Sequence, residues 1–116
     1  MRILIVDDEP MISLLLEDWL GELGHEVVGP AHNVASALAL IGPGFPDAAI
    51  VDVSLRGETG YPIAERLAEQ GIPFVFATGL AEGSLPPPFE NASMLSKPFD
   101  SAAVEAAIAR MAESAA

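Results

Sequence analysis

Acidic, hydroxyl and amine side chains follow successive apolar runs of this sequence. The residues are Asp7 and Asp8, then Asp52, then Thr78 and finally Lys97. If the runs are parallel strands, these side chains meet at one edge of a sheet, where open α/β sheets bind their ligands. Crowded carboxylates repel one another, and a hard divalent cation such as Mg²⁺ relieves that repulsion. The single lysine of the chain would then pair with an anion held at Asp52.

Each of these residues also has an ordinary structural interpretation. Asp7 and Asp8 could be an acidic helix start that complements the helix dipole. Thr78 could be a simple strand-end hydroxyl, and most lysines lie at protein surfaces, as Lys97 could. A solvated turn is a weaker interpretation for Asp52, because this acid directly follows the apolar run 48–51. Taken together, the acids, the hydroxyl and the lysine at successive strand ends predict a single site.

Short apolar runs that alternate with helical spacing predict the elements that carry these residues. Strands are expected over residues 2–6, 26–29, 48–52, 73–77 and 93–96. Helices are expected from Pro10 to Gly24, after the N-cap Asn33, from Tyr61 to Gln70 and after Asp100. This alternation predicts a doubly wound α/β fold, with a parallel sheet and helices on both faces.

The segment from Gly79 to Asn91 interrupts this alternation. Pro86-Pro87-Pro88 lies within it, and interior prolines remove helical hydrogen bonds and clash with the preceding turn. The fourth helix is therefore expected to be short or irregular, with no more than a turn over residues 80–82. We expect three apolar side chains of this segment to be exposed and to form a partner surface: Leu80, Leu85 and Phe89.

Composition narrows the function further. A chain of 116 residues with 51% hydrophobic content has room for one folded domain over residues 1–116. Cysteine is absent, which excludes disulfides and thiolate metal sites. The net charge of −12 opposes direct binding of nucleic acid. No run is long enough to span a membrane and no signal-peptide pattern is present, so we expect a cytoplasmic protein without a membrane segment.

Four motifs together resemble the receiver domain of two-component response regulators over essentially the whole chain. They are Val6-Asp7-Asp8-Glu9, Ile50-Val51-Asp52, Thr78-Gly79 and Lys97-Pro98-Phe99. The stretch from Phe74 to Gly79 is similar to the Phe-Ala-Thr-Gly (FATGUY-type) single-domain subgroup. The resemblance implies a flavodoxin-like, five-stranded parallel sheet of order 2-1-3-4-5.

The resemblance also implies roles for the candidate residues. Asp52 would be the phosphoacceptor, Thr78 and Lys97 would hold the phosphoryl oxygens, and the Lys97–Pro98 peptide bond would be cis. Mg²⁺ is the implied cofactor. Its implied ligands are Asp8, Asp52 and the backbone carbonyl of Ser54, with Asp7 acting through water.

The expected partner is a histidine kinase or a histidine phosphotransfer protein that donates the phosphoryl group. We expect a stand-alone receiver, since no output domain follows in this sequence. Output would be contact with an unknown downstream protein or a phosphorelay, and the receiver would be a monomer or weak dimer. It would catalyse only its own phosphorylation and dephosphorylation.

Two departures from the family pattern and two rival functions stay open at this point. Leu55-Arg56 stands where the family usually has Met-Pro, and Met94 stands where it usually has an aromatic switch residue. One rival is a small Mg²⁺-dependent aspartyl-phosphate hydrolase, which would need a second acid after Asp52, and Glu58 is the nearest. The other rival is a receiver-like binding module that never carries phosphate.

Overall fold

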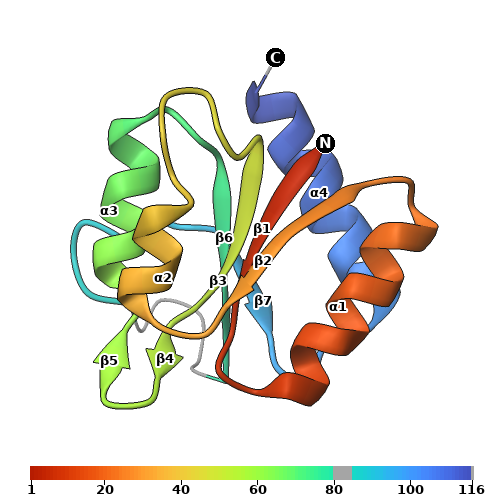
Figure 1. The fold of residues 1–116 in the computed structure, drawn as a ribbon, viewed down its shortest axis with the longest axis horizontal. Coiled ribbons are helices and arrows are strands. Elements are labelled where there is room, and N and C mark those ends of the chain that lie inside the picture. Colours follow the sequence, from red (N-terminus) through yellow and green to blue (C-terminus); the bar gives the residue numbers. More distant parts are fainter. Residues whose placement is uncertain (80–84, 116) are drawn as a thin grey trace.

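A five-stranded parallel sheet forms the centre of the protein, shown in Figure 1 as a computed structural model that describes residues 1–79 and 85–115. Its strands are β1 (Arg2–Val6), β2 (Glu26–Ala31), β3 (Ala48–Asp52), β6 (Phe74–Thr78) and β7 (Met94–Ser96). They lie in the order β2-β1-β3-β6-β7, and every neighbouring pair is parallel. The predicted doubly wound fold and strand order are confirmed.

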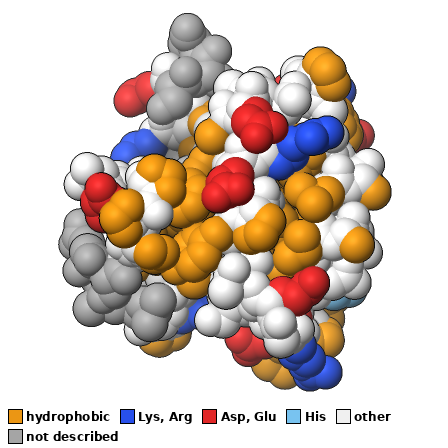
Figure 2. All heavy atoms as spheres, turned by 90° about the vertical axis from the view of Figure 1, so that its left-hand side faces the viewer, with side chains coloured by type: hydrophobic (Ala, Val, Ile, Leu, Met, Phe, Trp, Pro, Cys, Tyr) orange, Lys and Arg blue, Asp and Glu red, His pale blue; other side chains and the backbone are white. Residues whose placement is uncertain are grey.

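Helices cover both faces of this sheet. They are α1 (Pro10–Glu22), α2 (Val34–Ala39), α3 (Tyr61–Glu69) and α4 (Ser101–Ala115). Figure 1 shows α1 and α4 on one side of the strands and α2 and α3 on the other. Apolar side chains, with acidic ones among them, gather on the surface over α2 and α3 in Figure 2. Among the described residues, none of the helices has the length and apolar character needed to cross a membrane.

Alternation along the strands divides the core into two clusters. Ile3 and Ile5 of β1 pack with the cluster under α1 and α4, whereas Leu4 and Val6 pack with the cluster under α2 and α3. Successive side chains of a strand point to opposite faces, so a sheet covered on both sides needs apolar residues at every position. All five residues of β3 are buried, which explains why an unbroken apolar run precedes Asp52.

A small hairpin follows β3, where the sequence indicated only a loop. It consists of β4 (Ser54–Leu55) and β5 (Glu58–Thr59), paired antiparallel. The turn residue Gly57 has φ of +70°, a left-handed conformation that favours glycine. Glu58 Oε2 accepts a hydrogen bond from the backbone N–H of Val34, 3.1 Å away, and this contact ties the hairpin to the first turn of α2.

The segment between β6 and β7 is anchored by buried side chains. Its expected turn over residues 80–82, and Leu80 itself, lie outside the described residues. Residues 85–93 contain no helix or strand, as the prolines predicted. The expectation that Leu85 and Phe89 are exposed is wrong, because both are buried. The Phe89 ring stacks on Tyr61, with centroids 5.6 Å apart, and meets Phe76 edge-on at 5.4 Å.

Gly60 lies where the chain enters α3, against the end of β3. Its φ of −79° is open to any residue, but a Cβ there would overlap the backbone carbonyl oxygen of Asp52 and lie 2.8 Å from Val51 Cγ1. Gly60→Ala should therefore lower the free energy of unfolding by about 1–3 kcal/mol, as overpacking does. Urea denaturation measures this change.

Gly21→Ala is the matched control, because Gly21 lies within α1 and a Cβ there meets nothing within 4 Å. Alanine is the better helix former, so this variant should gain about 0.5–1 kcal/mol. Equal stability of Gly60→Ala and the unaltered protein would contradict the close-approach argument.

Candidate functional site

One amine and two carboxylates from three strand ends meet at the carboxyl edge of the sheet. The Nζ atom of Lys97, directly after β7, lies 2.9 Å from Asp52 Oδ2 at the end of β3. The same amine lies 3.4 Å from Asp7 Oδ2, directly after β1, and 3.3 Å from Glu9 Oε1. The strand order explains this meeting, because β1, β3 and β6 are neighbours and β7 lies beside β6.

Backbone N–H groups fix the two buried acids. Asp7 and Asp52 retain only 1% and 3% of their surface, so their charges depend on protein partners. The N–H of Glu9 donates to Asp7 Oδ1 at 2.8 Å, and the N–H of Ser54 donates to Asp52 Oδ1 at 3.0 Å. Each carboxylate therefore has one oxygen held by the backbone and one oxygen directed at Lys97.

Burial and mutual repulsion shape the ionisation of this site. Burial raises the pKa of Asp7 to about 6, and the charge of Asp52 adds to that rise against the N–H of Glu9 and the charge of Lys97. Burial alone would lower the pKa of Lys97, but its hydrogen bond to Asp52 and the charges of Asp52 and Asp7 outweigh that effect and raise it. Lys97 therefore stays protonated at any physiological pH.

The carboxylates of this edge fit a hard divalent cation. Asp7, Asp8, Glu9 and Asp52 each offer an oxygen, and these oxygens lie within 4.8 Å of one another. Apart from its 3.4 Å ion pair with Lys97, the buried Asp7 Oδ2 has no hydrogen-bond partner in the part of the chain that the structure describes. An oxygen-only donor set with a surplus of negative charge suits Mg²⁺, which takes one or two carboxylates and completes its shell with carbonyl oxygen and water.

Thr78 and Ser54 lie at the same edge. Asp52 is in register with Ala77 of β6, so Thr78 is one position further along, buried, and its carbonyl accepts the Lys97 N–H at 2.8 Å. Ser54 contacts Asp52 through its N–H, and the implied role of its carbonyl toward a metal stays a prediction. The Lys97–Pro98 bond is cis, as the resemblance implied.

Several contacts of the site were not predicted from the sequence. Glu9 reaches Lys97, and His32, which follows β2, places Nδ1 2.8 Å from the Asp7 carbonyl oxygen. Arg56 Nε lies 3.8 Å from Asp8 Oδ2. The departure of Arg56 from the usual family proline was a signal that this position differs. His32 carried no such signal, because its contact joins residues 25 positions apart.

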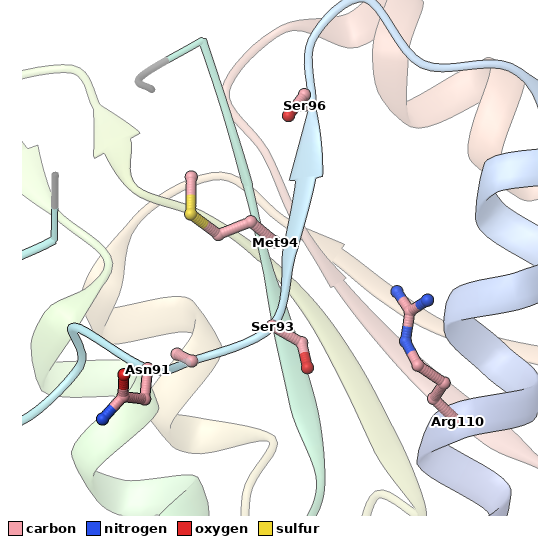
Figure 3. Close-up of a pocket in the computed structure, with 6 residues that line it drawn as sticks. Asn91, Ser93, Met94, Ser96 and Arg110 are labelled. Carbon is pink, nitrogen blue, oxygen red and sulfur yellow. The ribbon is translucent and has the colours of Figure 1, made fainter. Parts of the chain in front are cut away.

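A hollow in the surface lies beside β7, away from the acidic cluster. Figure 3 shows Met94 directed to one side of that strand, while Arg110 reaches toward it from α4 on the other side. Among the residues that the structure describes, its lining is Asn91, Ala92, Ser93, Met94, Ser96 and Arg110. Met94 is half-buried and packs against the cluster under α2 and α3, so a flexible thioether occupies the place of the family's aromatic residue.

Comparison with known proteins places this geometry in a family. A family model described as the response regulator receiver domain matches residues 3–109. The solution structure of SdrG from Sphingomonas melonis Fr1 is 47% identical, with a TM-score of 0.83 over 97% of this chain and 96% of that one. SdrG in its BeF3-activated conformation is 48% identical, with a TM-score of 0.78 over 93% and 92% of the two chains.

More distant relatives agree. TrrA from Thermotoga maritima, solved in complex with Mg(2+)-BeF, is 26% identical, with a TM-score of 0.82 over 95% of this chain and 97% of that one. The transcriptional regulatory protein PdtaR from Mycobacterium tuberculosis is 32% identical over 97% of this chain, which spans 58% of PdtaR. The doubly wound sheet and acidic edge are those of a two-component receiver. The chain belongs to the response regulator receiver domain family.

The raised pKa of Asp7 has a measurable effect on stability. The folded protein holds a proton on this carboxyl more tightly than the unfolded chain, whose pKa is near 3.8, so ionised Asp7 lowers stability at pH 7. In EDTA, Asp7→Asn should raise the free energy of unfolding at pH 7 by on the order of 1–2 kcal/mol, part of the gain being offset by the lost Lys97 contact. The gain should shrink as the pH falls from about 6 to 4.

Asp47→Asn is the control with the opposite sign. Hydrogen bonds from Arg2 lower the pKa of Asp47, so its ionised form favours the folded state. This variant should be less stable at pH 7, and the loss should shrink only as the pH falls below the ordinary pKa of 3.8. Guanidinium titrations at several pH values measure both variants. A stability loss in Asp7→Asn at pH 7 would contradict the repulsion inferred for this edge.

Proposed function

We propose that residues 1–116 form a receiver domain that accepts a phosphoryl group on Asp52. The donor is the phosphohistidine of a histidine kinase or a histidine phosphotransfer protein. The observation that carries the proposal is the 2.9 Å contact between Lys97 Nζ and Asp52 Oδ2 inside a cluster of acids. A carboxylate that ends a buried strand, faces a fixed amine and has metal-binding neighbours is equipped as an acceptor of an anionic group.

In the proposed step, a carboxylate oxygen of Asp52 forms a bond to phosphorus as the P–N bond of phosphohistidine breaks. The imidazole nitrogen keeps the electron pair and takes up a proton. Lys97 moves its contact from the carboxylate to the phosphoryl oxygens, and the Thr78 hydroxyl holds another of them. Positioning and charge compensation are the main contributions of a protein to this reaction.

Mg²⁺ is the proposed cofactor. When bound, it supplies the positive charge that offsets charge on the phosphoryl oxygens during transfer. Asp8, Asp52 and the carbonyl of Ser54 would hold it, with Asp7 acting through water. The BeF3-activated form of SdrG and the Mg(2+)-BeF complex of TrrA support both the acceptor and the metal.

An apolar groove beside the acids supports a protein as the donor. Part of α1 and the turn after β7 line it, next to Glu9 and Lys97: Ile12, Leu15, Trp19, Pro98 and Phe99. Along α1, Met11 is 75% exposed and Leu14 is 61% exposed, which leaves further apolar surface on this helix for a partner protein. The receiver itself is proposed to be a cytoplasmic monomer or weak dimer that belongs to the FATGUY-type subgroup and signals through a downstream protein.

The rival hydrolase function has less support. Its required second acid would be Glu58, but that carboxylate accepts the N–H of Val34 at the start of α2. The homologues of this chain are response regulators, which are signalling proteins rather than metabolic enzymes. Catalysis by this chain would be limited to its own phosphorylation and dephosphorylation.

Asp52→Asn tests the acceptor assignment. Incubation with acetyl phosphate and Mg²⁺ should add one acid-labile phosphoryl group to the unaltered protein and none to this variant, because an amide oxygen is a poor nucleophile. EDTA should prevent addition to the unaltered protein. Asp18→Asn, which removes an exposed acid of α1, is the control and should react normally. Intact-mass spectrometry gives the result, and full incorporation into Asp52→Asn would refute the assignment.

Lys97→Arg tests whether charge alone is sufficient at this position. A lysine amine is a compact point charge, whereas guanidinium is a planar fork that cannot occupy the same space between Asp52 and Asp7. The variant should keep its fold yet show a response to phosphorylation reduced about tenfold or more, on the scale of a lost charge-assisted contact. Circular dichroism checks that the fold is kept, and kinase-dependent signalling measures the response to phosphorylation. Normal signalling at normal stability would show that any cation is adequate.

A further inference from the structure

The exposed side chain of Arg56 lies beside the acidic cluster, and a contribution to folding stability does not explain its position there. Its side chain is 89% exposed, and its Nε lies 3.8 Å from Asp8 Oδ2. Ion pairs that are this long and this exposed contribute little to stability. The position of this guanidinium therefore calls for another role.

The backbone at Arg56 is held in place although its side chain is exposed. The Glu58 contact to Val34 ties the hairpin β4–β5 to α2, and the Gly60 N–H closes the base of the hairpin by donating to the Val53 carbonyl at 2.9 Å. Leu55, next to Arg56, is buried. The guanidinium is thus tethered beside Asp8 with freedom to change its contact.

The negative charge of the acidic cluster opposes the approach of the phosphoryl donor, which is the proposed substrate. Four carboxylates gather there in a chain of net charge −12, and an approaching phosphoryl anion is repelled by them. Lys97 is already engaged by Asp7, Glu9 and Asp52. Arg56 is a second cation at the same cluster, and a guanidinium fork is well suited to bind phosphoryl oxygens.

We propose that Arg56 binds the phosphoryl donor and that it changes partners when the metal binds. Without the divalent cation it contacts Asp8, and once the cation takes Asp8 it turns to the incoming phosphoryl oxygens. This proposal depends on the function proposed above, because it assumes that Asp52 is the acceptor. It assigns a role to the position where the chain departs from the usual proline of its family.

The proposal predicts two changes of opposite direction in one variant. Arg56→Gln removes a competitor for Asp8, so Mg²⁺ should bind about two- to fivefold more tightly, the range expected from an exposed ion pair. The same variant loses a donor contact, so phosphorylation by acetyl phosphate at saturating Mg²⁺ should slow about three- to tenfold. Arg56→Lys keeps the charge without the fork, and should restore more of the metal competition than of the rate.

Isothermal titration with Mg²⁺ and the observed rate of mass increase with acetyl phosphate measure the two effects. Arg66→Gln is the matched control, because it removes the same charge from an exposed position on α3. Arg66→Gln should leave both quantities near those of the unaltered protein.

Equal values for Arg56→Gln and Arg66→Gln would overturn the proposal. Weaker metal binding together with a slower reaction in Arg56→Gln would also overturn it, because that pattern identifies Arg56 as a brace of the metal site. If the unaltered protein is not phosphorylated at Asp52, the proposed function fails and this inference fails with it. If it is phosphorylated and Arg56→Gln reacts at the same rate, only this inference fails.

Discussion

The ion pair between Lys97 and Asp52 is the interaction on which the acidic edge depends. A parallel sheet with neighbouring β1 and β3 necessarily brings the acids after these strands together, and two of them are buried. Their repulsion would oppose folding if no cation lay between them. Lys97 supplies that cation from the end of the edge strand β7, which is only three residues long. Repulsion and compensation are thus built into the same topology.

The hairpin after β3 organises the rest of the site around that pair. Gly60 allows the chain to pass directly against the carbonyl of Asp52, and the N–H of Ser54 holds the carboxylate of the same residue. Glu58 connects the hairpin to α2, so the loop next to the acceptor is attached to a helix of the scaffold. A site made of strand ends and short turns gains its rigidity from such contacts rather than from its own secondary structure.

The sequence was informative where one residue type has few structural alternatives. The apolar runs ending on Asp7 and Asp52 predicted both the strands and their common edge, because a strand buried on two faces tolerates little else. The hairpin was not predicted, since two-residue strands have no periodicity to detect. The burial of Phe89 was missed because it depends on rings far away in sequence, those of Tyr61 and Phe76.

The aromatic residues give the protein one optical reporter on each side of the sheet. The single tryptophan, Trp19, belongs to α1 and packs against the cluster between the sheet and helices α1 and α4. Its ring centroid lies 6.3 Å from that of Phe99, two residues after Lys97. The single tyrosine, Tyr61, lies on the opposite side and stacks on Phe89. Fluorescence of Trp19 therefore reports on the apolar groove beside Glu9 and Lys97. Absorbance of Tyr61 reports on the segment around Phe89, between β6 and β7. Events in the two layers can be timed separately without attaching any label.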